Sequence, residues 1–467
     1  SIMTAIIALS LLGILNLFLG FWLSRKTIQA ATLLFLAGSM ALTAMDWNHE
    51  ILWYGHMFHT TNTSISFSLI IQLAAFMVVS FSKGFGIDEE HTHPAEYYAI
   101  LLFSVVGAIL MVSFDHLIMF FVGLEILSVA MYVLTGSDKR NLRSNEAALK
   151  YFLMGSFATG ILLFGITLVY GATRSFYLTN IALNIANTPP ESTPVFLSIG
   201  VLMILVGFLF KVSAAPFHFW TPDVYEGAPT IFTMFMSTVV KAASFAALYQ
   251  VLSGPFGTMY GTWVYPIYYI SMLTLLVGNI TAVYQQSVKR MLAYSSISHA
   301  GYLLLTISAN QTSTTSTILY YSLSYTLATI VAFGTVMLVA EYQTGRTEKP
   351  ENFSSFEGLA KQNPGLAFCF TISVLSLAGI PLTAGFWGKF FVFSDLFNRH
   401  VYYPVILAIV MSAVGVYYYF KGIIAIYFKE GDIERIELPG LVKLAMWACT
   451  LGTLLLGIYP SIVKNLF

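Results

Sequence analysis

The chain has 467 residues with 22 basic and 22 acidic side chains, so its formal net charge is zero. Hydrophobic residues make up 57% of it, charged residues only 9%, and the mean hydropathy is +0.77. This composition excludes a soluble globular domain and a basic nucleic-acid-binding protein, and it predicts an all-α polytopic protein of the lipid bilayer.

Apolar runs long enough to cross a bilayer recur along the chain and predict fourteen transmembrane helices. The first run has no basic leader, so we expect it to be retained as a span. Three connections are long: residues 46–63 and 173–194, which are apolar enough to lie on the membrane surface, and 341–364, which we expect to be a solvated linker. The predicted spans are 2–23, 28–46, 64–82, 96–114, 115–136, 148–171, 195–220, 228–252, 262–286, 291–309, 314–341, 365–397, 402–428 and 440–462.

Basic residues are distributed unevenly between the two sides of these spans. Loops rich in Lys and Arg stay in the cytoplasm, so the odd-numbered loops are predicted to be cytoplasmic and both termini to face the other side. The even loops and the two ends hold Arg174, Arg399 and Lys464. The odd loops hold Arg25, Lys26, Lys83, Lys139, Arg140, Arg143, Lys150, Lys289, Arg290, Arg346, Lys349, Lys361, Lys429 and Arg435.

The seventh span contains the stretch GFLFKVSAAPFHFWTPDVYEGAPT, residues 207–230. It places Lys211 at membrane depth, where a lysine costs roughly 2.5–3.5 kcal/mol and marks a candidate functional site. Pro216 removes a backbone donor and predicts that the helix breaks just past the lysine. Broken helices at membrane depth are found where they line protein or a wet cavity. The alternative is a proline kink with a lysine that reaches the membrane surface.

The fifth span carries an acidic residue halfway along it. Glu125 is followed by Ser128 and Tyr132 at i+3 and i+7, which gives this helix one polar stripe and makes Tyr132 an auxiliary site residue. A buried carboxylate and a buried lysine each favour their neutral forms unless they lie together. We therefore expect Glu125 to pair with Lys211, either as a proton-transfer pair or as a static ion pair.

Four further lysines lie inside predicted spans. Lys421 and Lys443 are close enough to the cytoplasmic ends to reach the membrane surface, whereas Lys241 and Lys389 are not. Lys241 sits among small residues in the eighth span, where the alternative is a core lysine bonded to backbone carbonyls. Lys389 follows Pro381 in a twelfth span interrupted by glycines. Interrupted helices with a lysine, five spans apart, predict two inverted five-helix repeats with broken helices 7 and 12. The predicted units are 1–95 (helices 1–3), 96–252 (first repeat), 262–428 (second repeat) and 440–467 (last helix).

Histidines and cysteines complete the set of candidate groups. His218 and His299 lie in apolar surroundings and could shuttle protons, or simply hydrogen-bond neighbouring helices. The cluster from Asp88 to His93 reads as a solvated turn rather than a metal site. Cys369 and Cys449 form neither a CxxC pair nor a disulfide framework, so no metal site is predicted. The residues alone therefore indicate a proton or cation conductor.

Three stretches of the chain carry a resemblance to a known family: FLFKVSAAPFHFWTPDVYEGAPT, VKRMLAYSSISHAGY and VGLEILS. The chain resembles the antiporter-like membrane subunits of respiratory complex I, and the resemblance extends from the third span to the thirteenth. PFHFWTPDVYEGAPT favours the subunit N branch, since the sister subunits L and M typically read HTWLPDA there. The eighth span also lacks their histidine-rich stretch. The resemblance implies the fourteen-helix inverted-repeat fold and a proton path through Glu125, Lys211, Lys241 and Lys389.

The resemblance also implies partners and a location. The whole complex would be a translocase of the bacterial plasma or inner membrane that passes electrons from NADH to quinone. FMN, iron–sulfur clusters and quinone are expected in partner subunits and no cofactor in this chain, whose neighbours would include other antiporter-like subunits. One rival is a subunit of a Mrp-type sodium/proton antiporter. Another is a structural membrane spacer, against which four ionisable groups at mid-membrane argue.

Overall fold

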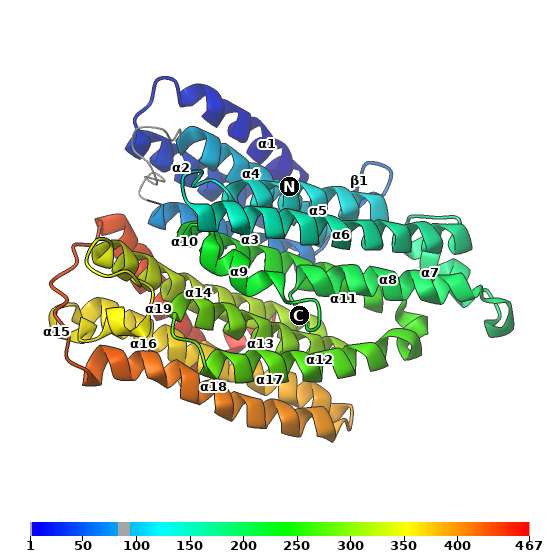
Figure 1. Ribbon diagram of the computed structural model, residues 1–467. Coiled ribbons are helices and arrows are strands. Elements are labelled where there is room, and N and C mark those ends of the chain that lie inside the picture. Colours follow the sequence, from blue (N-terminus) through cyan, green and yellow to red (C-terminus); the bar gives the residue numbers. More distant parts are fainter. Residues whose placement is uncertain (1, 83–93, 467) are drawn as a thin grey trace.

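The computed structural model describes residues 2–82 and 94–466, and helices lying side by side make up most of it (Figure 1). In these ranges, eleven helical segments are long and apolar enough to cross a membrane. The three remaining predicted spans correspond to one uninterrupted helix, α13, and to two broken ones, α8 with α9 and α16 with α17. The predicted fourteen-helix membrane fold is therefore confirmed.

The elements up to residue 253 hold the first broken helix. They are α1 (Ile2–Leu19), α2 (Arg25–Ala44), β1 (Ile51–Trp53), β2 (Phe58–Thr60), α3 (Asn62–Phe81), α4 (Pro94–Ser113), α5 (Leu117–Thr135), α6 (Leu142–Thr173), α7 (Leu178–Ala186), η1 (Pro190–Ser192), α8 (Val195–Lys211), α9 (Trp220–Gly227), α10 (Thr230–Phe235), the π-helix η2 (Met236–Val240) and α11 (Lys241–Ser253).

The remaining elements hold the second broken helix. They are η3 (Gly257–Met259), α12 (Tyr260–Val283), α13 (Val288–Ala309), α14 (Thr314–Gln343), η4 (Phe353–Phe356), α15 (Leu359–Gln362), α16 (Pro364–Ala378), α17 (Ala384–Asn398), α18 (Tyr402–Phe428), α19 (Gly440–Ile458) and α20 (Ser461–Lys464).

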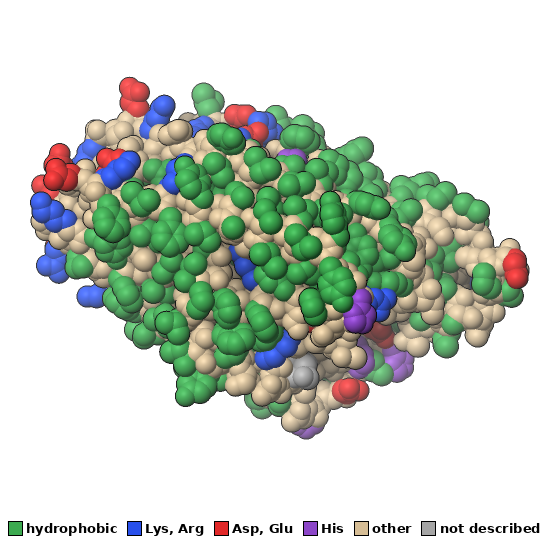
Figure 2. Space-filling view, turned by 90° about the horizontal axis from the view of Figure 1, so that it is seen from below, with side chains coloured by type: hydrophobic (Ala, Val, Ile, Leu, Met, Phe, Trp, Pro, Cys, Tyr) green, Lys and Arg blue, Asp and Glu red, His purple; other side chains and the backbone are tan. Residues whose placement is uncertain are grey.

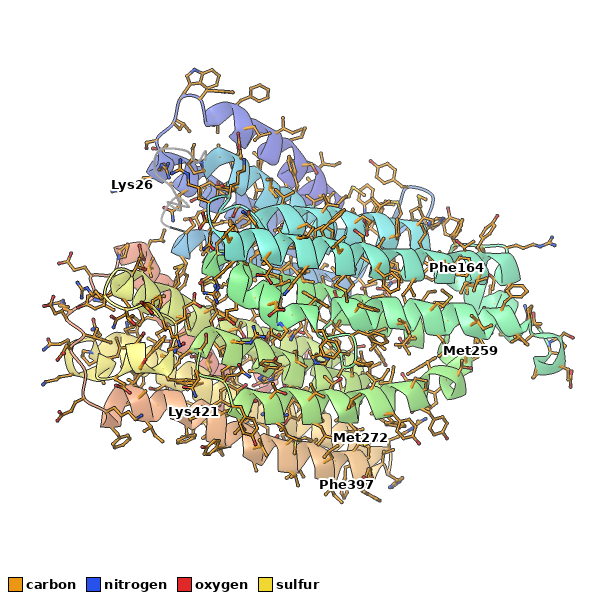
Figure 3. The ribbon with its side chains drawn as sticks, viewed as in Figure 1. Lys26, Phe164, Met259, Met272, Phe397 and Lys421 are labelled. Carbon is orange, nitrogen blue, oxygen red and sulfur yellow. The ribbon has the colours of Figure 1, made fainter. Side chains whose placement is uncertain are left out.

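The helices run between two ends of the bundle. We call the end that carries the odd-numbered loops the basic end; it lies on the left in Figure 1, and the opposite end, with α7 and β1, lies on the right. Charged side chains gather at the basic end and apolar ones cover the middle of the face seen in Figure 2. Large apolar side chains also point outward from the helices, such as Phe164 of α6 and Phe397 of α17 (Figure 3), as a lipid-facing surface requires.

Close helix packing follows the same order in both halves. α4 packs on α5 and α6 on α8, as α12 packs on α13 and α14 on α16 and α17. Glycine allows the tightest of these contacts: a Cβ on Gly107 of α4 would lie 2.7 Å from the carbonyl oxygen of Gly123 on α5. The correspondence supports two repeats, 96–252 and 262–428, whose boundaries stay a prediction.

The long connections are more structured than the sequence suggests. Residues 51–60 form an antiparallel hairpin, and 178–186 form the short helix α7, with Ile181 buried and Leu183 exposed. The expectation of a solvated linker over 341–364 is wrong for its second half. There Phe356 and Leu359 are fully buried, because η4 and α15 fold back onto α18.

Candidate functional site

The first broken helix has the shape that Pro216 predicts. α8 ends at Lys211 and α9 begins at Trp220, so the lysine stands at the break. The backbone amide of Ala215 donates to Thr274 Oγ1 (3.0 Å), and the Trp220 indole donates to the carbonyl of Phe210 (3.0 Å). These bonds satisfy polar groups that the break would otherwise leave unpaired at membrane depth.

The Lys211 amine points at the polar stripe of α5. Its Nζ donates to the hydroxyls of Tyr132 (3.2 Å) and Ser128 (3.5 Å), and to the carbonyl of Gly155 on α6 (3.2 Å). As the last residue of α8, it also lies at the negative end of a half-helix, which favours a cation. The predicted stripe therefore exists, and Tyr132 is part of the site.

Glu125 does not form the direct pair with Lys211 that the sequence suggests. Its Oε1 accepts a hydrogen bond from Thr159 Oγ1 on α6 (2.8 Å), and it acts on Lys211 only electrostatically. Ser128, one turn further along α5, takes the place next to the amine. Glu125 is half-buried, and exposed Val122 and Val129 flank it on α5, so the carboxylate lies close to the lateral surface of the bundle.

Lys241 is buried, 5% exposed. Its Nζ donates to both the carbonyl and the hydroxyl oxygen of Ser296 on α13, each at 2.5 Å, and lies 4.9 Å from the ring centre of Tyr325. The bond to the Ser296 carbonyl agrees with the alternative of a core lysine bonded to backbone carbonyls. The Ser296 hydroxyl and the Tyr325 ring are partners that this alternative does not include. The residue directly follows the π-helix η2, an irregularity that often marks functional sites.

In the second broken helix, Lys389 lies on the second half-helix and its amine reaches back to the end of the first. α16 ends at Ala378, Gly379 has φ +80°, and α17 starts at Ala384. A Cβ on Gly385 would overlap the carbonyl oxygen of Ser376, so only glycine fits there. The amine donates to the Ala378 carbonyl (3.3 Å) and lies 4.8 Å from the ring centre of Tyr302; the side chain is 6% exposed.

His299 lies between these two lysines. Its ring nitrogens hydrogen-bond the hydroxyls of Tyr321 (2.5 Å) and Tyr419 (3.0 Å), and both Lys241 and Lys389 act on it electrostatically. A small cavity beside it has room for about one water molecule. Its lining is His299, Tyr321, Ser324, Tyr325, Ser376, Leu377, Gly385 and Lys389. The structure therefore brings Lys241, His299 and Lys389 into one buried cluster.

His218 stands apart from this cluster. It lies in the first break, 7% exposed, with its ring stacked on Phe219, and its Nδ1 has no hydrogen-bond partner among the described residues. The stretch Asp88–His93 lies outside the described residues.

Sequence reasoning found Ser128 and Tyr132 at Lys211 but missed the hydroxyl groups around Lys241 and His299. Tyr321 and Tyr325 occur at i and i+4 on α14, and their hydroxyls or rings contact His299 and Lys241. The chain has 27 tyrosines, so this spacing alone could not have singled them out. Together the hydroxyls, the imidazole and the amines form a set of groups through which a proton can pass, with water bridging the longer gaps.

Comparison with known proteins places the chain in a family. The family model for the transmembrane region of NADH:quinone oxidoreductase and Mrp antiporters matches residues 115–455. NADH-quinone oxidoreductase subunit N of Cytophaga hutchinsonii is 41% identical over 468 residues, 99% of each chain. A chain of respiratory complex I from Thermus thermophilus has a TM-score of 0.84 at 33% identity, covering 99% of this chain and 98% of that one. A chain of the Mrp complex from Dietzia sp. DQ12-45-1b has a TM-score of 0.82 at 18% identity, covering 99% and 93%, and shows a shared fold alone. The chain therefore belongs to the subunit N family of NADH-quinone oxidoreductases.

Proposed function

We propose that this chain is the proton-translocating subunit N of an NADH-quinone oxidoreductase and that Glu125, Lys211, Lys241 and Lys389 carry its proton path. The observation that supports the path best is the buried cluster of Lys241, His299 and Lys389, two amines separated by an imidazole. Ionisable groups at membrane depth are rare unless they serve transport.

The first break supplies the proton. Lys211, held by Ser128 and Tyr132, takes it up near Glu125 and passes it toward Lys241 through water. Ser296 and His299 then connect Lys241 with Lys389. The charge on Glu125 changes how readily Lys211 holds its proton, because each charge stabilises the other in a medium of low dielectric constant.

The rest of the reaction belongs to partner subunits. FMN and iron–sulfur clusters would carry electrons from NADH to quinone there, and the released energy would reach this chain as charge changes in neighbouring membrane subunits. The basic end would face the bacterial cytoplasm and both termini the other side of the inner membrane. A Mrp-type antiporter is the weaker alternative, since the likeness to the Mrp chain extends to the fold alone.

The first test is assembly. Purified gently, the chain is expected to come with the other membrane and peripheral subunits of an NADH-quinone oxidoreductase, identified by mass spectrometry. Co-purification with Mrp subunits, or proton transport that stops when sodium is left out, would favour the antiporter instead.

The second test is transport by the assembled complex in vesicles. Lys211→Met is expected to lower NADH-driven proton uptake while the complex stays assembled on native gels. Lys421→Met is the matched control, because that lysine also lies in a span but binds the carbonyls of Val283 and Gln285 near the basic end and lies over the Phe353 ring. Uptake by Lys211→Met at the control's level would refute the proposed path.

A further inference from the structure

A buried carboxylate that the proton path does not yet use lies on α17. Asp395 follows Lys389 by six residues and is 2% exposed. Its Oδ2 accepts a hydrogen bond from Thr306 Oγ1 and its Oδ1 one from Ser313 Oγ, both at 2.6 Å. Lys464 acts on it electrostatically but gives its own hydrogen bond to Thr317 Oγ1 (2.8 Å). The carboxylate is therefore held by hydroxyl groups, which can both donate and accept protons.

One face of α13 connects the lysines with this carboxylate. Ser296, His299, Tyr302 and Thr306 are spaced three, three and four residues apart, so their side chains lie on one stripe of the helix. Ser296 binds Lys241, the Tyr302 ring lies under Lys389, and Thr306 binds Asp395. The stripe covers about 15 Å along the helix axis, roughly half the thickness of a bilayer core.

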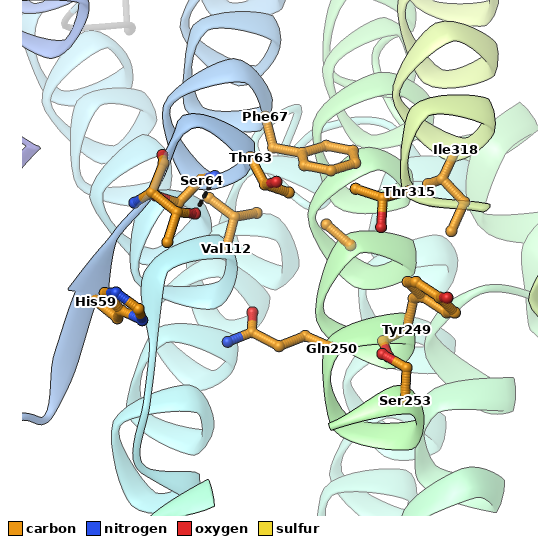
Figure 4. A pocket seen from close by; sticks show the side chains of 12 residues that line it. His59, Thr63, Ser64, Phe67, Val112, Tyr249, Gln250, Ser253, Thr315 and Ile318 are labelled. Carbon is orange, nitrogen blue, oxygen red and sulfur yellow. Dashed lines mark hydrogen bonds between the residues drawn. The ribbon is translucent and has the colours of Figure 1, made fainter. Parts of the chain in front are cut away.

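The stripe continues into a cavity at the opposite end. Thr314 Oγ1 donates to the carbonyl of Thr306 (3.3 Å) and contacts the hydroxyl of Tyr249, on which Asp395 also acts electrostatically. Tyr249 lines a cavity of about 230 Å³ with room for several water molecules (Figure 4). Polar groups of four elements face it, among them His59, Gln250, Ser253 and Thr315.

One residue that lines this cavity, His59, belongs to a group of titratable side chains. Asp115, between α4 and α5, is close enough to His56 and His59 to feel both imidazoles. Burial raises the pKa of Asp115, and the two histidines oppose that shift. The cavity is therefore linked, through His59, to a carboxylate outside its lining.

We propose that Asp395 is the release group of this chain, through which protons leave Lys389 for the cavity at the opposite end. This inference rests on the proposed function. The Lys389 ammonium gives up its proton and becomes a neutral amine, while the Asp395 carboxylate becomes a carboxylic acid. The acid then protonates cavity water and is a carboxylate again, and Lys389 regains its charge from the next proton that arrives from Lys241 through His299. Six residues of helix separate the two side chains by about 9 Å, so Tyr302, Thr306 or a water molecule must bridge them.

The competing role for Asp395 is structural. Its two hydrogen bonds also join α17 to α13, through Thr306, and to the start of α14, through Ser313. Asp395→Asn distinguishes the two, since the amide keeps the size and one acceptor oxygen but cannot carry a proton away. In the assembled complex in vesicles, we expect it to lower the ratio of protons taken up to NADH oxidised at least about tenfold, and Asp395→Glu to restore most of it. Asp432→Asn, an exposed aspartate at the basic end, is the control and should leave the ratio unchanged.

The same assay separates this inference from the proposed function. Lys389→Ala is measured alongside: if it stops proton uptake and Asp395→Asn pumps like the wild type, the release group is wrong and the lysine path stands. If both variants pump normally, both proposals fail.

A second measurement covers the case in which Asp395→Asn does not assemble. Thr315→Cys places a thiol in the cavity, and a charged, membrane-impermeant thiol reagent is added from the side that the opposite end faces. Proton uptake by the labelled Thr315→Cys complex should then fall. Uptake by Leu183→Cys, with its thiol on the exposed face of α7, should not change after labelling. The native Cys369 and Cys449 are buried, so the reagent does not reach them. Undiminished uptake after complete labelling of Thr315→Cys would overturn the proposal.

Discussion

Each of the two broken helices places a lysine at membrane depth, but the surroundings of the two amines differ. In the first, Lys211 is the last residue of α8 and its amine binds groups of α5 and α6. In the second, the Lys389 amine reaches back to the carbonyl of Ala378, the last residue of α16. Lys211, however, faces hydroxyls and the charge of half-buried Glu125, near the lateral surface. Lys389 is enclosed by aromatic rings and a histidine.

This difference indicates two roles. A charge on a neighbouring subunit can act on the first break, because Glu125 lies close to the lateral surface and the low dielectric of the membrane screens charges weakly. The second break is shielded, so a proton there has to move through hydrogen-bonded groups. Charge changes in neighbouring subunits would therefore act on proton transfer at the first break, and the second break would carry the same protons along a shielded route.

The strongest challenge to this comparison is Lys389→Met. It removes the amine from the shielded site and leaves an apolar chain of similar size. We expect NADH-driven proton uptake to fall by on the order of 10²-fold, the lower range for a positioned proton-transfer group. Vesicle assays on complexes matched for assembly measure it. Uptake within a factor of two of the wild type would mean that the second break carries no protons.

Lys241→Arg tests whether the central position needs a proton or only a charge. Arginine keeps the positive charge but does not release its proton in a protein. Uptake should therefore fall nearly as far as in Lys241→Ala. Ser296→Thr is the control, since it keeps the hydroxyl that the amine binds. A Lys241→Arg complex that pumps normally would make this lysine an electrostatic fixture.

Glu125→Gln probes the first break, where we expect a smaller effect. The amide keeps the partner of Thr159 but removes the charge that acts on Lys211. Loss of one such interaction changes a proton equilibrium roughly tenfold, about 1.4 kcal/mol. Thr159→Val is measured beside it and should be milder, because the carboxylate remains. If Glu125→Gln were as severe as Lys389→Met, every proton would have to pass through this carboxylate, and its effect on Lys211 would be the smaller part of its role.

The sequence predicted the fold and the lysines because each leaves a local signal. Apolar runs define the spans, Pro216 and Gly379 define the breaks, and a lysine inside an apolar run stands out. The side chain that a lysine contacts depends on how the facing helix is rotated and shifted, and a shift of one helical turn changes the partner. For that reason the sequence paired Lys211 with Glu125, whereas the structure puts Ser128 beside it. Asp395 was passed over because it lies near the end of its span, where a carboxylate ordinarily meets water.

The smallest expected effect is that of Tyr132→Phe at the first break. The hydroxyl is one of three acceptors of the Lys211 amine, at 3.2 Å, and the other two, Ser128 and Gly155, remain. Loss of one hydrogen bond costs about 1 kcal/mol, which corresponds to about a fivefold change in the population of the competent amine position. Because the amine keeps its proton and the charge of Glu125, proton uptake should drop by no more than that factor. Tyr284→Phe, an exposed tyrosine after α12, controls for losing a phenol hydroxyl elsewhere. A drop in Tyr132→Phe as large as in Lys211→Met would show that this hydroxyl passes the proton itself, in addition to holding the Lys211 amine.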